Sequence, residues 1–143
     1  MFISVEGLRT DPEEWKAAQA LQPDQLPALT PEQREVATQL KIAEEQYARS
    51  ILAGQRTTEK LLKKTEWFAR FFEELIHHKG SPAKIERVTL DTWAASFEVK
   101  IHGREYPLKI DEGLVDDLFE KGSAVAEQGL SRIADVAIGA GVV

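Results

Sequence analysis

The sequence contains no cysteine, which excludes disulfide bonds, thiolate metal sites and cysteine nucleophiles. Its first residues lack a basic start followed by an apolar run of roughly 7–15 residues, so we expect no secretory signal. No apolar stretch approaches the length of a membrane span either. We therefore expect a cytoplasmic protein without a membrane partner, whose fold is held together by packing alone.

Positive charge is also in short supply, with 18 Lys and Arg against 24 Asp and Glu. A net charge of −6 is the wrong sign for a phosphate-binding surface, so no nucleic-acid partner is expected. We interpret the one locally basic stretch as a solvated helix face, and we interpret an acidic row later in the chain in the same way. The basic residues are Arg56, Lys60, Lys63 and Lys64, and the acidic row is Glu112, Asp116 and Glu120.

Motifs that carry chemistry are missing as well. The chain has no glycine-rich phosphate loop, and none of its serines lies in a nucleophile-elbow context. We therefore expect no catalytic residue, no cofactor and no enzymatic activity. What the chain does have is an ordinary globular composition, with 43% hydrophobic and 29% charged residues over 143 positions, so it should fold around one core.

The first 30 residues predict an arm with a short helix and a proline-containing strap. Residues 2–8 alternate weakly and could form a short strand. Thr10 or Asp11 can cap a helix over about 12–21, since Pro12 suits the first helical position. Three prolines follow and bias the chain after this helix toward an extended conformation.

Residues 31–79 predict helix. Thr30 and Gln33 have the spacing of a capping box, and no proline follows until the end of the segment. Apolar or small residues recur at coiled-coil spacing, but an unbroken helix would be roughly 70 Å long and would need a partner. The alternative, which we favour, is a helical hairpin in which Gly54 ends one helix and Thr57 or Thr58 begins the next.

Residues 84–110 change to alternating periodicity, which predicts a three-stranded antiparallel meander. A two-residue turn at His102–Gly103 would return the chain so that Val99 faces Tyr106. Pro107 cannot donate a ladder hydrogen bond, so the last strand should lie at an edge of the sheet. The expected apolar face of the middle strand is Trp93, Ala95, Phe97, Val99 and Ile101.

The remainder of the chain predicts a C-terminal helix from about residue 112, interrupted near Gly122. One of its faces is narrow enough for another backbone to approach, with Ala126, Gly129 and Ile133 following Gly122 at helical spacing. The last residues, VAIGAGVV, carry no charge, so we expect them to be tucked into a groove or frayed.

The aromatic segment TEWFARFFEELIHHKG is the densest feature of the sequence. On a helical wheel its apolar arc covers half of the helix circumference. A single partner helix cannot bury an arc of that width. We expect this helix to lie between another helix and the apolar face of the sheet formed by Trp93, Phe97 and Val99. The alternative is that part of the arc is exposed as a docking surface for another subunit. The predicted interaction residues are Trp67, Phe68, Phe71 and Phe72, together with Val36, Leu40 and Tyr47 of the helical seam.

Two adjacent histidines follow this segment, but His77 and His78 are about 100° apart on a helix and cannot hold one metal ion together. Glu74 and His77 have the Glu-x-x-His spacing of carboxylate-bridged di-iron helices, although they fall on the polar side of the wheel. The adjacent carboxylates of Glu44–Glu45 could add ligands only if a second subunit enclosed them. We assign no metal site and interpret the histidines as solvated residues near a helix C-terminus.

Together these features predict an α+β fold, with an arm over 1–30, helices over 31–79 and a meander plus helix over 80–143. The last two segments are expected to form one domain. The expected function is that of a non-catalytic, oligomerising structural or adaptor protein, such as a component of a virion or other large assembly. Its first partner would be a second copy of itself. A small regulatory module that binds one protein partner is the alternative, and a metal-binding helical oligomer is the third.

Overall fold

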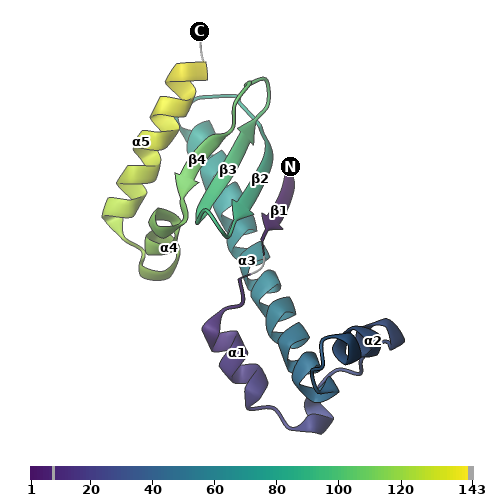
Figure 1. Cartoon of the computed structure of the whole chain (residues 1–143). Helices are drawn as coiled ribbons and strands as arrows, with labels where there is room; N and C mark the ends of the chain where they lie inside the picture. Colours follow the sequence, from purple (N-terminus) through teal and green to yellow (C-terminus); the bar gives the residue numbers. More distant parts are fainter. Residues whose placement is uncertain (8, 142–143) are drawn as a thin grey trace. The chain divides into compact units, whose positions relative to one another are not determined.

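We describe residues 1–7 and 9–141 of the chain from a computed structural model, shown in Figure 1. The fold is α+β, as predicted from the change in periodicity. It divides into two compact units. Unit 1 joins residues 1–7 to the chain from Leu61 onward, and unit 2 is the segment between them, which ends at Lys60. Unit 2 is therefore inserted into the sequence of unit 1.

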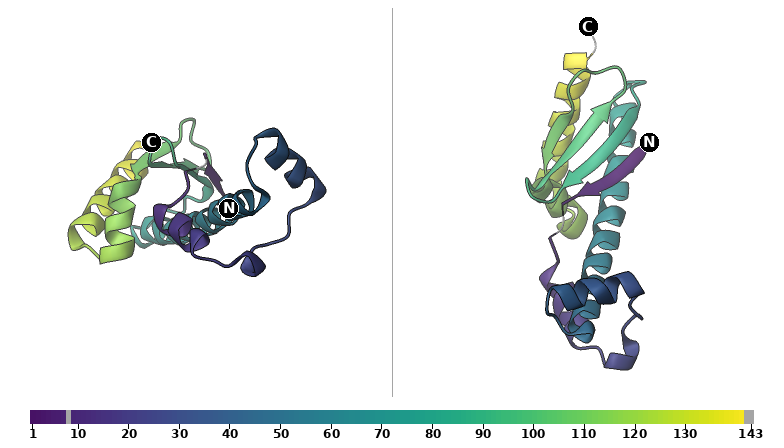
Figure 2. Two further views of the ribbon diagram at one scale, coloured as in Figure 1. Left: turned by 60° about the horizontal axis from the view of Figure 1, so that its bottom comes forward. Right: turned by 45° about the vertical axis from the view of Figure 1, so that its right-hand side comes forward.

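Unit 1 contains a four-stranded mixed sheet in the order β1-β2-β3-β4. The meander predicted from the sequence is present, but β1 adds a fourth strand, parallel to β2, so the prediction of three strands is wrong. Figure 2 shows β1 at one edge of the sheet and β4 at the other. The strands are β1 (Phe2–Glu6), β2 (Ile85–Asp91), β3 (Ser96–Ile101) and β4 (Leu108–Asp111).

The register of the last two strands differs from the prediction by two residues. Val99 pairs with Leu108, not with Tyr106. The tight turn at His102–Gly103 does form, with a φ of +85° at its glycine, but the chain then leaves the sheet before β4 begins. Tyr106 is consequently 76% exposed. Because side chains alternate with a period of two, a two-residue shift keeps the apolar residues on the same face.

Trp93 is not on the apolar face of the sheet, where the alternating pattern had placed it. It lies in the turn at 92–95 and is 76% exposed, because the Asp91 carboxylate accepts a hydrogen bond from the Trp93 backbone N–H at 3.0 Å and stabilises a turn there. Its ring covers Gly7, where an added Cβ would lie 2.5 Å from the indole. Gly7 has a φ of +84°, so glycine is needed at this position for two independent reasons.

The core of unit 1 lies between one face of the sheet and the helices α3 (Glu44–His78), α4 (Glu112–Lys121) and α5 (Ala124–Gly141). The opposite face is polar, and the Ser4 and Thr89 hydroxyl groups are 2.8 Å apart on it. The C-terminal part of α3 therefore packs against the sheet, as the width of its apolar arc predicted. The largest fully buried side chains include Phe68, Phe72, Phe97, Ile76, Leu90, Ile110 and Leu130.

The C-terminal helix is interrupted where predicted. Helix α4 (Glu112–Lys121) ends at Gly122, which has a φ of +61° and allows a left-handed cap. The narrow face of α5 does admit close packing, since a Cβ on Gly129 would lie 3.2 Å from the Leu114 side chain of α4. Ala137, within the uncharged tail, is buried in the core, whereas residues 142–143 of that tail lie outside the described residues.

Unit 2 contains α1 (Pro12–Gln19), the short 3-10 helix η1 (Pro23–Gln25), α2 (Pro31–Gln39) and the first part of α3. The predicted caps form. The Asp11 carboxylate accepts from the Glu13 backbone N–H at 2.9 Å, and Thr30 and Gln33 make both hydrogen bonds of a capping box. Within the described residues of this unit, the buried hydrophobic side chains are small: Ala18, Ala37, Ala48 and Ala53.

The helical segment breaks at a different place from the one predicted. The hairpin broken at 53–60 is wrong, because α3 is one long helix that runs from Glu44 through Gly54 to His78. The alternative of a long helix is confirmed for this part of 31–79, whereas residues 31–39 form the separate helix α2, which ends at Gln39. Lys41 follows the end of α2 in the left-handed conformation, with a φ of +58°. The Ile42 backbone N–H donates to the Ala37 carbonyl at 3.0 Å and so caps the C-terminus of α2. The proposed coiled-coil seam is therefore divided between two helices.

Candidate interaction surface

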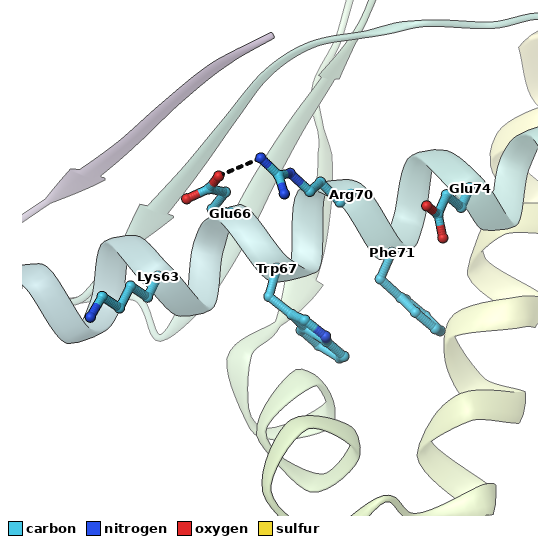
Figure 3. A pocket seen from close by; sticks show the side chains of 6 residues that line it. All are labelled: Lys63, Glu66, Trp67, Arg70, Phe71 and Glu74. Carbon is cyan, nitrogen blue, oxygen red and sulfur yellow. Dashed lines mark hydrogen bonds and ion pairs between the residues drawn. The ribbon is translucent and has the colours of Figure 1, made fainter.

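Three aromatic side chains meet at the surface of unit 1. Trp67 and Phe71 lie one turn apart on α3, and Figure 3 shows both rings projecting from the same side of the helix. Their centroids are 5.4 Å apart and their planes differ by 13°, so they are stacked. Phe119 of α4 adds a tilted ring at 4.9 Å from Trp67. We call these three residues the aromatic surface.

The aromatic surface is only partly covered. Phe119 is 45% exposed, and Trp67 and Phe71 are half-buried. Phe68 and Phe72, which the sequence also suggested for interaction, are fully buried, and the Phe68 ring lies 4.8 Å from that of Phe97 in the core. Those two residues belong to the core of unit 1 and are not part of its surface. For Trp67 and Phe71 an interaction role stays a prediction.

A groove of about 430 Å³ runs along α3 beside the stacked rings. The charges of its lining residues sum to zero, because two are cations and two are anions. Arg70 and Glu66 form an ion pair at 2.7 Å within the helix, as Figure 3 shows. The six residues that line the groove are Lys63, Glu66, Trp67, Arg70, Phe71 and Glu74.

A buried ion cluster connects the two helices that carry the aromatic surface. The Lys64 ammonium of α3 lies 2.9 Å from the Glu112 carboxylate and 2.8 Å from that of Asp116 on α4. Burial alone would lower the pKa of Lys64, but hydrogen bonds to Asp116 and Glu112 outweigh it and leave this pKa raised. Lys64 therefore stays charged at neutral pH, and its two bonds hold α4, and with it Phe119, against α3.

The sequence did not reveal this cluster, because Lys64 and the acidic row had both been interpreted as solvated. Lys64 is only 11% exposed, and Glu112 is buried. Its bonds to Glu112 and Asp116 span 48 and 52 positions of the chain. The only available signal was the i, i+4 spacing of the two acids, which many exposed helices also show.

The remaining predicted interaction residues lie in unit 2. Val36 is exposed on α2, Leu40 follows that helix and is 58% exposed, and Tyr47 is half-buried on α3. A shallow hollow of about 820 Å³ also lies in this unit, lined by small and polar residues apart from Ile51. Neither feature gathers aromatic side chains, so the aromatic surface is the stronger candidate for a binding site.

The histidines do not assemble a site. His77 Nε2 makes a hydrogen bond of 2.9 Å with the Ala83 carbonyl, and both His78 and Glu74 are exposed. Among the residues that the structure describes, no three His, Asp or Glu side chains are grouped so that they could hold a metal ion.

Comparisons of the chain with protein-family models, curated proteins and solved structures give no match. In the described parts of the chain, no helix has both the length and the apolar character needed to cross a membrane. Function must therefore be inferred from the residues of unit 1 themselves, above all from the aromatic surface and its groove.

Proposed function

We propose that this protein is a non-catalytic, self-associating structural or adaptor protein that acts through protein–protein contacts at the aromatic surface. The observation that supports the proposal is the stacking of Trp67 on Phe71 beside a partly exposed Phe119. The proposal retains the expected cytoplasmic location, and a role in a virion or another large assembly is one form that such a protein could take.

The stacked geometry favours binding for an energetic reason. A side chain that is free in solution loses about 0.5–1.5 kcal/mol of conformational entropy when an interface immobilises it. Trp67 is already held between two other rings, so little of this cost remains. Tryptophan is also enriched among interface residues whose truncation costs about 2 kcal/mol or more.

The surroundings of the rings fit the same role. Charged side chains such as Lys63, Arg70 and Glu74 border the apolar centre of the groove, which matches the polar rim around an apolar core in protein interfaces. The buried Lys64 cluster keeps α4 in place, so the surface is preorganised before a partner arrives.

Sedimentation at micromolar protein concentration tests the proposal. The wild type should sediment as an oligomer in both low and high salt, because apolar burial drives the contact. Trp67→Ala should weaken self-association by about 30-fold, the equivalent of about 2 kcal/mol. Tyr106→Ala is the matched control, since it removes an exposed aromatic ring from the loop before β4.

A sharp wild-type monomer near 16.0 kDa in both salts would contradict self-association and favour a regulatory module that binds a different protein. Dissociation only in high salt would show that charges rather than rings hold the subunits together. Circular dichroism of each variant separates loss of association from loss of folding.

A further inference from the structure

We infer that the occupant of the groove is the same groove of a second copy of this chain, with the two α3 helices antiparallel about a twofold axis. The inference rests on the proposed self-association and adds its partner geometry. An interface between identical copies about a twofold axis must be self-complementary, because residue i contacts residue j and residue j contacts residue i.

The spacing of the groove residues has this symmetry. Along α3 the six lining positions follow intervals of 3, 1, 3, 1 and 3, which read the same in both directions. If a second copy of the helix runs antiparallel and the two are aligned at the midpoint between Phe68 and Ala69, the six lining positions of one copy coincide with those of the other. Such a stripe can form a continuous seam with an antiparallel copy of itself.

The outer charges of the stripe, Lys63 and Glu74, are complementary in the antiparallel arrangement. Reversal places Lys63 opposite Glu74 of the second copy, and symmetry makes this pair twice. It also places Trp67 opposite Arg70 of the second copy, a cation–π pairing, and Glu66 opposite Phe71. In a parallel arrangement with the helices in register, Lys63 would meet Lys63 and Glu74 would meet Glu74, which would be repulsive.

The outer charges of the stripe are available for this use. Lys63 and Glu74 are both exposed, and neither takes part in an ion pair within the described residues. Arg70 and Glu66, by contrast, already pair within their own helix. The two positive and two negative side chains cancel, so the groove gives no preference to a strongly acidic or strongly basic partner over a second copy.

Charge reversal at the two ends of the stripe tests the inference by sedimentation. Lys63→Glu creates two Glu–Glu contacts per dimer and Glu74→Lys creates two Lys–Lys contacts, so each variant alone should associate at least about tenfold more weakly. An equimolar mixture of the two should regain the wild-type affinity as a heterodimer. The double variant Lys63→Glu/Glu74→Lys should regain it as a homodimer.

The matched control is Glu127→Lys, an equivalent reversal at an exposed position of α5, which should leave association unchanged. Wild-type association of either single variant, or a mixture that stays monomeric although the wild type associates, would overturn the antiparallel geometry and leave self-association standing. A wild type that is monomeric throughout would instead overturn the proposed function itself.

Discussion

The two units differ in the side chains that each buries in its own interior. Unit 1 buries phenylalanine, leucine, isoleucine and valine side chains between sheet and helices. In the described part of unit 2, residues 9–60, the buried side chains are four alanines and Thr57. Stabilisation by burial scales with apolar area, at about 25 cal/mol per Å², so the methyl groups of alanine contribute little each. Unit 2 is largely helical, so we expect that helix content is a poor guide to the relative stability of the two units.

Polar links replace apolar burial in unit 2. The Thr57 hydroxyl accepts from the Asp11 backbone N–H at 3.0 Å, and the Lys60 ammonium lies 2.9 Å from the Asp11 carboxylate. The Arg49 side chain donates to the Leu21 carbonyl at 3.0 Å. Hydrogen bonds of this kind contribute about 0.5–1.5 kcal/mol each, so unit 2 should open more easily than unit 1.

The largest expected effect is that of Phe72→Ala, which would remove much of the apolar burial that stabilises unit 1 relative to unit 2. Phe72 is fully buried, so the substitution should destabilise the protein by about 3–5 kcal/mol, and Phe97→Ala should do the same. Phe71→Ala is the control, one position along and half-buried, with an expected cost of less than half as much. Denaturant unfolding measures all three, and equal costs for Phe71→Ala and Phe72→Ala would contradict the assignment of faces.

The second prediction compares one lysine from each unit. Lys64→Met leaves the Glu112 carboxylate buried without its partner and should cost about 2–3 kcal/mol, less than a fully buried pair because Asp116 is partly exposed. Lys60→Met breaks exposed pairs in unit 2 and should cost only about 0.2–1 kcal/mol. Similar costs for the two substitutions would contradict the distinction between the units.

The pH dependence of this second effect has a definite sign. The pKa of Lys64 is raised in the folded protein above its ordinary value of 10.5, because its carboxylate partners outweigh the effect of burial. The stabilisation from Lys64 is therefore fully present below about pH 10.5 and is lost as pH rises through the folded pKa. The difference in unfolding free energy between wild type and Lys64→Met should be constant near neutral pH and shrink in strong alkali.

A small stabilising effect is expected from two substitutions in unit 2. Lys41 has a φ of +58°, a conformation that glycine adopts without strain, so Lys41→Gly should stabilise the end of α2 by about 0.5–1 kcal/mol. Gly54→Ala should give a similar gain inside α3, where an added Cβ would meet nothing within 4 Å. Hydrogen exchange of the α2 amides measures the first gain, and faster exchange in Lys41→Gly would show that this lysine makes a contact worth more than the strain.

The parts of the fold that depend on neighbouring residues were predictable. Helix N-caps form at Asp11 and Thr30, and a C-cap forms at Gly122, each where the sequence indicated. All three depend only on hydrogen bonds and backbone angles of residues close in sequence. The break at Lys41 was missed because a lysine took the left-handed position that glycine usually holds, while Gly54 stayed inside a helix. Local propensity alone therefore did not identify which of these two sites ends a helix.

The candidate site was predictable only in part. Helical periodicity placed Trp67, Phe68, Phe71 and Phe72 on one wide arc, but it could not show which edge of that arc the sheet covers. That division depends on α4, which Lys64 holds in place through bonds to residues 48 and 52 positions away. Phe119 was missed for the same reason, since nothing near it in sequence points to Trp67.

The parallel pairing of β1 with β2 has a consequence for synthesis. Ser4 meets Thr89 across 85 positions, so β1 leaves the ribosome long before its partner exists. At about 5–20 residues per second the wait is roughly 4–17 seconds, and an unstructured loop of this length costs roughly 4 kcal/mol to close. Early folding of unit 2, which occupies most of that loop, would shorten it and so ease the docking of β1.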